Sequence, residues 1–159
     1  MQALMMDRAL SLPSILEYAA RYHPQRQVVD RTVEGPIHRY GYADALIRTK
    51  RMANALIAMG VKPGDRVATL AWSTHRHFEL YFAVTGIGAI LHTINPRLHA
   101  DQIVWVANHA EDSFLFFDNT FAGQVAELKD RMPLVKRFVA MTDRANLPAD
   151  APADRKSVV

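Results

Sequence analysis

Short apolar runs alternate with helical patterns along most of this sequence, and this alternation constrains the fold more than any single motif. The runs typical of buried strands are 66–71, 90–94, 113–117 and 137–141. Apolar spacing between these runs predicts helices over 78–87, over 100–108, and around Phe121, Val125 and Leu128. A strand, a helix and a second strand in succession require a crossover connection, which favours parallel pairing. We therefore expect an α/β fold of three layers, with a largely parallel sheet and flanking helices.

The first sixty residues predict helices and a hairpin that precede this alternation. A helix is expected over 12–21, with Leu12, Ile15, Leu16 and Ala19 on one face, and two strands over 28–32 and 37–40 around the turn Glu34–Gly35–Pro36. The clearest helix runs over 42–59 and should end at Gly60, where a left-handed residue closes the last turn. The side chains expected to face the core from this helix are those of Leu46, Thr49, Ala53, Leu56 and Ile57.

Composition excludes several classes of protein. The chain has 159 residues, enough for one domain, and its formal net charge of +3 comes from scattered lysines and arginines. A nucleic-acid interface would concentrate them in a stripe, so we expect no nucleic-acid partner. The absence of cysteine excludes disulfides and thiolate metal sites and fits a reducing compartment. With no signal-peptide pattern and no apolar run near the roughly 20 residues of a membrane span, we expect a cytoplasmic protein without a transmembrane segment.

The stretch TGIGAILHTINPRL (Thr85–Leu98) contains a G-x-G that could belong to a phosphate-binding loop. A dinucleotide-binding fingerprint needs a third glycine and lies between a strand and the helix that follows it. Here the pair follows a helix and precedes a strand, and Leu91 occupies the third glycine position. No Gly-Lys-Ser/Thr triplet occurs in the chain. We therefore interpret Gly86 and Gly88 as packing glycines at the end of a buried helix.

The remaining residues with catalytic potential do not form a recognisable site. His75 and His77 are two residues apart, a spacing that places helical side chains on different faces, and His92, His99 and His109 have no compact acid cluster near them in the sequence. No serine among 11, 14, 73, 113 and 157 lies in G-x-S-x-G. Glu111–Asp112 is expected to be a solvated turn, and Phe114, Phe116 and Phe117 to be sheet core. We predict no catalytic, cofactor-binding or metal-ligating residue, and the substrate-binding residues stay open.

Five blocks in fixed order nevertheless resemble a known family. They are R-x-A-N-A-L-x-x-x-G-V-x-P-G-D-R-V-A (Arg51–Ala68), RHFELYFAV (Arg76–Val84), GAILHTINPRL (Gly88–Leu98), NHAEDSFLFFD (Asn108–Asp118) and FVAMTD (Phe138–Asp143). Together they resemble the N-terminal part of AMP-forming acyl-CoA synthetases, of the adenylate-forming superfamily. The closest branch is that of medium- and long-chain fatty-acid–CoA ligases, including the (methylthio)alkanoate type.

The resemblance implies an acid–thiol ligase that uses ATP, Mg²⁺ and coenzyme A in its full-length form. A carboxylic acid and ATP would give an acyl-adenylate and pyrophosphate, and coenzyme A would then displace AMP to form the thioester. The family's Ser/Thr/Gly-rich phosphate loop ending in Pro-Lys-Gly is absent from this sequence, as are its later motifs. The resemblance thus implies an incomplete N-terminal subdomain, inactive alone, over residues 1–147. It also implies a possible homodimer, and a non-catalytic interaction module or a small ligand-binding domain remains the alternative.

Three local features carry further expectations. Relatives place Thr or Ser where Gly41 precedes the long helix, and we expect glycine to be the weaker cap. His99 and Gln102 should retain only the second half of a capping box. Residues 148–159 are expected to be a disordered tail, and the last six of them (154–159, DRKSVV) match one translated frame of a common sequencing adapter, which predicts an artefact.

Overall fold

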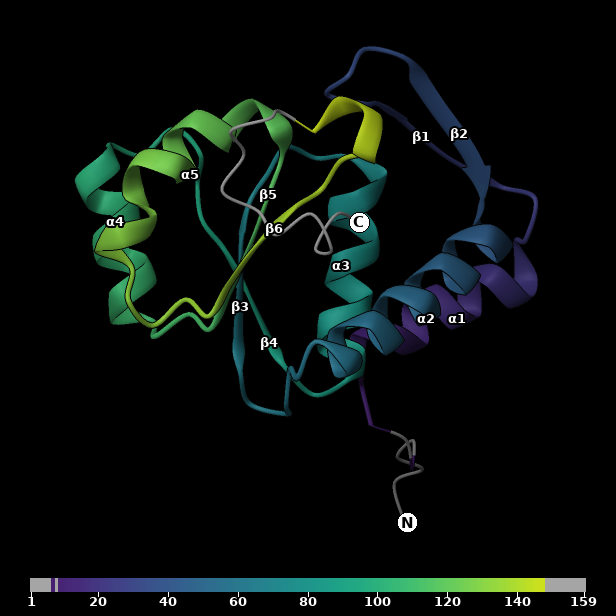
Figure 1. The fold of residues 1–159 in the computed structure, drawn as a ribbon. Helices are drawn as coiled ribbons and strands as arrows, with labels where there is room; N and C mark the ends of the chain where they lie inside the picture. Colours follow the sequence, from purple (N-terminus) through teal and green to yellow (C-terminus); the bar gives the residue numbers. More distant parts are fainter. Residues whose placement is uncertain (1–6, 8, 148–159) are drawn as a thin grey trace.

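The structure is a computed structural model that describes residue 7 and residues 9–147. Its centre is a parallel sheet in the strand order β4-β3-β5-β6 (Figure 1). The strands are β3 (Arg66–Leu70), β4 (Ile90–Thr93), β5 (Phe114–Phe117) and β6 (Arg137–Ala140). These bounds lie within one residue of the predicted runs at each end, and the parallel pairing that the alternation predicted is confirmed.

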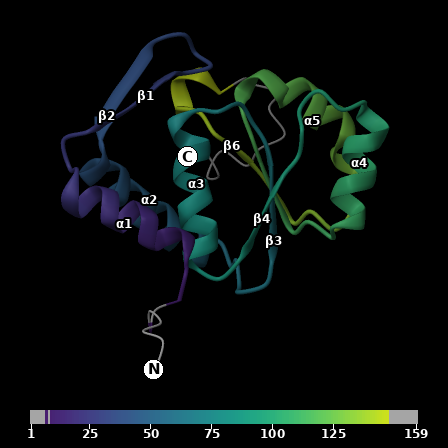
Figure 2. The ribbon, with the colours of Figure 1, turned by 180° about the vertical axis from the view of Figure 1, so that it is seen from behind.

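Helices cover both faces of this sheet, as the three-layer prediction required (Figures 1 and 2). On one face, α2 (Tyr42–Ala58) and α3 (His75–Gly86) pack on sheet residues such as Val67 and Phe116. On the other face, α4 (Ala100–His109) and α5 (Ala122–Leu128) pack on residues such as Phe117. Alternate residues of β5 therefore enter opposite cores, and all four of its side chains are buried. Short 3₁₀ turns occupy Asn119–Phe121, Lys129–Arg131 and Arg144–Asn146.

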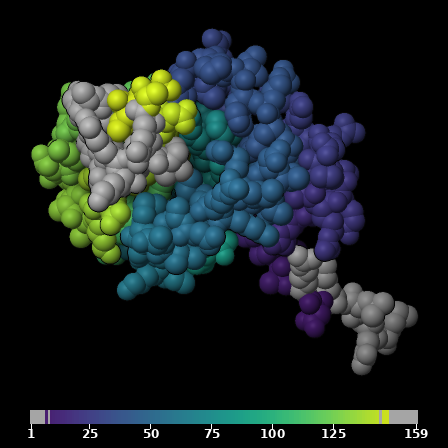
Figure 3. All heavy atoms as spheres, turned by 45° about the vertical axis from the view of Figure 1, so that its right-hand side comes forward, coloured from purple at the N-terminus to yellow at the C-terminus, as the bar shows by residue number. Residues whose placement is uncertain are grey.

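The N-terminal elements form a separate layer beside α3. Helix α1 (Leu12–Tyr22) packs on α2 and α3, and the antiparallel hairpin of β1 (Gln27–Arg31) and β2 (Ile37–Gly41) follows it. The tip of the hairpin reaches the C-terminal edge of the sheet, where its blue atoms adjoin the yellow atoms near residue 143 (Figure 3). The hairpin is thus held against the rest of the molecule at its tip as well as at its base.

Two helical faces differ from their predictions. In α1 only Leu16 is fully buried, whereas Ile15 is 59 % exposed and Leu12 is exposed as well. In α2 the buried stripe consists of Ala45, Thr49, Met52 and Leu56, while Ile57 is 57 % exposed. Both helices contact neighbours along a single narrow stripe, so apolar residues beside it remain at the surface.

Helix caps differ more from what the sequence predicts, which is a side-chain cap from Ser73 or Thr74 on α3 and from Asn119 or Thr120 on α5. Thr74 is the N-cap of α3, but it gives no side-chain hydrogen bond to the helix. Neither Asn119 nor Thr120 caps α5, because a 3₁₀ turn precedes that helix.

The capping box of α4 is complete, contrary to expectation. The His99 Nδ1 atom accepts from the Asp101 backbone N–H at 3.4 Å, and the Gln102 side chain accepts from the His99 N–H at 3.1 Å. An imidazole nitrogen therefore supplies the acceptor that a Ser or Thr hydroxyl usually provides.

Gly41 and Gly88 occupy positions where a side chain does not fit. A Cβ atom at Gly41 would lie 2.5 Å from the carbonyl oxygen of Pro24, so the Ser or Thr of relatives would not improve this cap, contrary to expectation. Gly88 has φ of 78°, and a Cβ there would lie 3.3 Å from the Cβ of Pro63. Its carbonyl accepts from the Gly64 N–H at 2.9 Å, which joins the end of α3 to the turn before β3. The predicted packing role of Gly88 is confirmed, and Gly60 has the predicted positive φ of 93°.

The tail predictions for 148–159 fall outside the described residues.

Candidate functional site

The carboxyl edge of the parallel sheet is the first candidate, because ligands of open α/β sheets bind where neighbouring connections diverge. Here the chain leaves β3 toward β4 on one side, and β5 lies on the other side. Trp72 follows β3 at this point and Asp118 follows β5. The Trp72 backbone N–H donates to Asp118 Oδ2 at 2.6 Å, and its indole N–H donates to Thr120 Oγ1 at 3.0 Å. The switch point is therefore closed by the chain's own polar contacts.

Asp118 is the most perturbed carboxyl group at this edge. It is fully buried, and its Oδ1 atom has no hydrogen-bond partner among the described residues. Burial raises the pKa of Asp118 to about 6, against the opposing effect of the hydrogen bond from Trp72. A carboxyl group of this kind can exchange a proton near neutral pH. Its hydrogen bonds involve no serine or lysine, so the described residues around it do not form a nucleophilic site.

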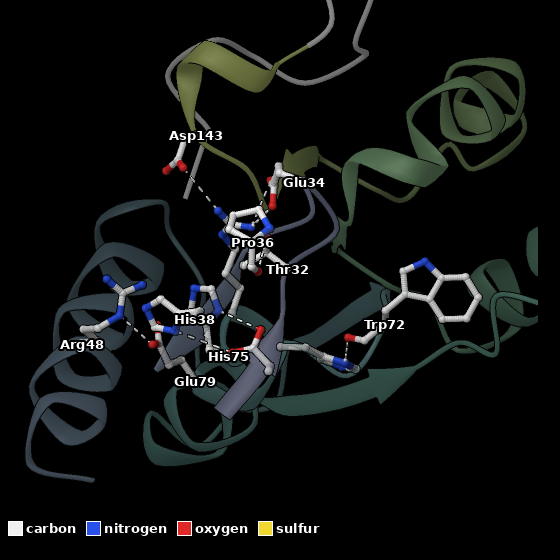
Figure 4. A network of polar contacts seen from close by, with 12 residues as sticks. Thr32, Glu34, Pro36, His38, Arg48, Trp72, His75, Glu79 and Asp143 are labelled. Carbon is white, nitrogen blue, oxygen red and sulfur yellow. Dashed lines mark hydrogen bonds and ion pairs between the residues drawn. The ribbon is translucent and has the colours of Figure 1, made fainter. Parts of the chain in front are cut away.

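A second candidate lies where the hairpin meets the start of α3 (Figure 4). Asp30 of β1 pairs in register with His38 of β2, and His75 begins α3 beside them. The His75 Nδ1–H donates to Asp30 Oδ2 at 3.1 Å, and His38 Nδ1 lies 3.6 Å from Asp30 Oδ1. The rings of His38 and His75 stack with centroids 3.9 Å apart. Burial lowers the pKa of His75, although the hydrogen bond to Asp30 opposes that effect.

A buried ion pair beside this cluster holds the hairpin tip to the sheet. The Arg76 Nη1 atom donates to both carboxylate oxygens of Glu34, each at 3.1 Å, and the Thr142 hydroxyl donates to Glu34 Oε1 at 2.7 Å. Burial alone would raise the pKa of Glu34, but the hydrogen bonds from Thr142 and Arg76 hold it below its usual value. Asp143, which is exposed, lies 3.5 Å from Arg76 Nη2 (Figure 4). These contacts hold the hairpin in place and engage both Nη atoms of Arg76 with carboxylates of the chain itself.

A second ion pair joins α2 to α3, with a buried carboxylate and a partly exposed guanidinium. The Arg48 Nε–H donates to Glu79 Oε1 at 2.6 Å, and Glu79 is 2 % exposed (Figure 4). The neighbouring Tyr40 is buried, and burial together with the nearby Glu79 carboxylate raises the pKa of its hydroxyl. Tyr40 is therefore neutral at any physiological pH. This pair fixes the spacing of two helices and gives no sign of catalysis.

An open cavity of about 430 Å³ lies between β1 and α3. Its polar lining residues include the buried Thr74, whose Oγ1 atom has no hydrogen-bond partner in the part of the chain that the structure describes. The other lining side chains are mostly apolar: Leu12, Val28, Val29, Phe78, Tyr81 and Phe82. A mostly apolar lining with a few polar groups is typical of ligand pockets, although this cavity opens to solvent.

The histidines singled out from the sequence are distributed over the molecule rather than brought together. His77 is satisfied locally: its Nδ1–H donates to the Trp72 carbonyl at 3.2 Å and its Nε2 accepts from the Thr69 hydroxyl at 3.0 Å. His99 caps α4, and His109 stacks on Trp105. His75 differs, because the sequence showed no acid near it whereas the hairpin places Asp30 in contact.

The Glu111–Asp112 prediction is half wrong. Glu111 is exposed, but Asp112 is fully buried and accepts from His92 Nδ1–H at 2.8 Å. Burial raises the pKa of Asp112, and the contact with His92 opposes the effect. Glu111 has a positive φ of 54°, so the chain turns sharply here and sends adjacent carboxylates in opposite directions.

Phe114, Phe116 and Phe117 are buried in the sheet as predicted.

Sequence reasoning did not identify Asp30, Glu34 or His38. Each is an ordinary polar residue of a predicted hairpin, and only the register of β1 with β2 places Asp30 opposite His38. The turn Glu34–Gly35–Pro36 was the one available signal, because pairing outward from it brings residues 30 and 38 together.

Comparisons with known proteins agree with one another. The sequence profile described as "AMP-binding enzyme" matches residues 16–158. The chain is 43 % identical over 140 residues to the 3-methylmercaptopropionyl-CoA ligase of Ruegeria lacuscaerulensis, covering 88 % of this chain and 26 % of that protein. It is 44 % identical over 149 residues to the medium-chain-fatty-acid–CoA ligase of Ectopseudomonas oleovorans, covering 93 % and 27 %. The chain thus spans about a quarter of the length of these relatives.

Solved structures give the same fold. A Rhodopseudomonas palustris protein, provisionally described as a long-chain-fatty-acid CoA ligase, superposes with a TM-score of 0.74 at 33 % identity, over 84 % of this chain and 33 % of that one. The coronafacic acid ligase of Pectobacterium brasiliense has a TM-score of 0.78 at 15 % identity, over 94 % and 28 %, which shows the fold alone. No helix within the described part of the chain has the length and apolar character to cross a membrane. Because the profile matches most of this chain and two ligases are more than 40 % identical to it, the chain belongs to the AMP-binding enzyme family.

Proposed function

We propose that this chain is the N-terminal portion of an ATP-dependent fatty-acid–CoA ligase. In the whole enzyme, a carboxylate oxygen of the acid would attack the α-phosphorus of ATP, and pyrophosphate would leave. The sulfur of coenzyme A would then attack the acyl carbon, and AMP would leave as the thioester forms. The observation that carries this proposal is the sequence identity of 43–44 % to two CoA ligases over most of the chain.

The residues present do not fit a site for the ATP phosphates, and we derive no catalytic step through them. The seven glycines are dispersed, without the Gly-rich run that wraps phosphate groups with backbone N–H groups. Arg48 of α2 and Arg76 of α3 are already paired with Glu79 and Glu34. The proposal therefore assigns this part a scaffolding role and expects no activity from it alone.

The whole enzyme is proposed to act on a medium- or long-chain acid or a (methylthio)alkanoate, with ATP, Mg²⁺ and coenzyme A. It is also proposed to be cytoplasmic, because the composition of this sequence fits a reducing compartment. A homodimer is proposed because the family resemblance implies one. Sedimentation of the full-length enzyme at several concentrations tests the dimer.

The decisive experiment extends the reading frame to its natural stop codon and measures AMP release with acids of graded chain length, in the presence of ATP and coenzyme A. We expect acid-dependent AMP and a matching amount of thioester, with a maximum at one chain length. An enzyme that releases no AMP with any acid contradicts the assignment. In parallel, the 159-residue chain is expected to release none, and acid-dependent AMP from that chain would overturn its scaffolding role.

A further inference from the structure

The proposed function makes no use of the cluster of Asp30, His38 and His75. Its three residues come from three elements, β1, β2 and α3, and each can offer one ligand atom within 4.8 Å of the other two. The Asp30 and His75 side chains are only 8 % and 5 % exposed. The His38 side chain is 33 % exposed, so the cluster lies at the border between the core and the solvent.

Two atoms of the cluster lack the hydrogen bonds that burial normally requires. Asp30 Oδ1 and His38 Nδ1 are both shielded from solvent, and neither has a hydrogen-bond partner among residues 9–147. They face each other at 3.6 Å, which is too long for a hydrogen bond. A buried polar atom left unpaired costs roughly 1–3 kcal/mol, and here two such atoms lie side by side. A cation coordinated by both atoms would satisfy them together.

We propose that Asp30, His38 and His75 bind one Zn²⁺ ion, with water in the fourth coordination position and with any proton on a ligating nitrogen released to solvent. Two imidazole nitrogens and one carboxylate oxygen form a mixed ligand set that zinc accepts readily in tetrahedral geometry. The same set disfavours Mg²⁺ and Ca²⁺, which prefer oxygen ligands. The sequence predicts no metal site, because it pairs His75 only with His77. Asp30 and His38 lie far from His75 in the chain, and only the folded hairpin brings them to it.

The stacked rings show what binding must change. The planes of His38 and His75 are inclined by only 23°, so their in-plane lone pairs run nearly parallel and do not meet at one ion. One ring must turn for both nitrogens to bind. His38 is the ring with more room to do so, because its side chain is 33 % exposed and contacts only the rings of Tyr40 and His75 among the described aromatic side chains, whereas His75 is 5 % exposed. The proposal therefore includes loss of the ring stacking when zinc binds.

A bound ion would also connect the hairpin to α3. Metal that binds the folded state and not the unfolded state raises the apparent stability by mass action. Because β1, β2 and α3 each contribute one ligand, the stabilisation should appear in the cooperative unfolding of these elements.

The test uses the 159-residue chain after removal of metal with EDTA. Zinc is titrated in competition with a chromophoric chelator, and the unfolding temperature is measured with Zn²⁺ and with Mg²⁺. We expect one tightly bound Zn²⁺, a higher unfolding temperature with zinc, and no change with Mg²⁺. Co²⁺ used as a probe should give the intense visible bands of a tetrahedral site.

Two variants and one control assign the site. His38→Ala and Asp30→Asn should each weaken zinc binding roughly tenfold or more. Asp30→Asn keeps an oxygen that can accept from His75, so it decides the question if His38→Ala fails to fold. His109→Ala removes an imidazole that lies on the far side of the sheet, in α4, and should bind zinc as the unaltered chain does. Unchanged zinc binding in Asp30→Asn, or the absence of a one-to-one zinc complex in the unaltered chain, overturns the proposal.

Discussion

Two buried aspartates flank strand β5, and their different partners give them different chemistry. Asp112, before the strand, accepts hydrogen bonds from His92 on both carboxylate oxygens. Asp118, after the strand, accepts from the Trp72 N–H on one oxygen only, and its other oxygen is unpaired. Burial disfavours the charged form of either group, but Asp118 has less to offset that cost. The sequence places both residues beside an apolar run, and only the structure distinguishes them.

Asp118 should make the stability of the chain depend on pH. Its folded-state pKa of about 6 lies above its ordinary value of 3.8, so between these values the folded state binds more protons than the unfolded state. The free energy of unfolding should therefore fall as pH rises through this window, by roughly 3 kcal/mol, and level off above it. Asp118→Asn keeps an acceptor for Trp72 and cannot titrate. Urea unfolding at several pH values between 4 and 7.5 should show the variant gaining stability relative to the unaltered chain as pH rises.

The control for this experiment is Glu127→Gln, which removes one negative charge from the exposed surface of α5. A stability difference between Asp118→Asn and the unaltered chain that is the same at all pH values would contradict the role given to burial.

Among elements, agreement between sequence and structure follows the strength of the local pattern. The runs that became β3 to β6 and the long helix α2 were predictable, because buried apolar runs and helical periodicity are local properties. The caps of α3 and α5 were not, since a hydroxyl at the right position forms a cap only if the preceding backbone aims it correctly. The candidate site was less predictable still. It depends on the register of the hairpin and on where α3 begins relative to it, both of which are set by packing between elements.

Two glycines in different elements provide a matched test of this packing. Gly88→Ala should lower the free energy of unfolding by about 1–2 kcal/mol, because an L-residue is strained at φ of 78° and the new Cβ meets Pro63. At Gly123 in α5, nothing lies within 4 Å of the added Cβ atom. Gly123→Ala should therefore raise the free energy of unfolding by up to about 1 kcal/mol. Urea denaturation of both variants measures the difference. Equal effects of the two alanines would show that neither strain nor contact at Gly88 matters.

At the scale of the whole molecule, the hairpin depends on few contacts beyond its own two strands. A two-stranded sheet is marginal by itself, and this one is held by α3 behind it and by Glu34 at its tip. Glu34 connects three segments that are distant in the sequence: the hairpin turn, Arg76 of α3 and Thr142 after β6. At its tip, the hairpin is therefore joined to the rest of the molecule through the Glu34 carboxylate. Folding lowers the pKa of Glu34 from its ordinary value of 4.5. Its contribution to the stability of the folded state is therefore fully present above pH 4.5 and is lost as the pH falls through the lowered, folded-state pKa.

Glu34→Ala should release the hairpin while the central sheet stays intact. The substitution leaves Arg76, 7 % exposed, without its main partner, and the remaining partner Asp143 is exposed and 3.5 Å away. A buried charge that loses its partner lowers the free energy of unfolding by several kcal/mol. Because Arg76 can still pair with Asp143, we expect a loss of about 2 kcal/mol. Hydrogen exchange should become faster at the amides of β1 and β2 and stay unchanged in β3 and β5. Asp143→Asn, which removes only the exposed partner, should change exchange little, because exposed ion pairs contribute less than about 1 kcal/mol. If Glu34→Ala accelerated exchange equally in the hairpin and the sheet, the two layers would unfold as one unit and the tie at Glu34 would not be what joins them.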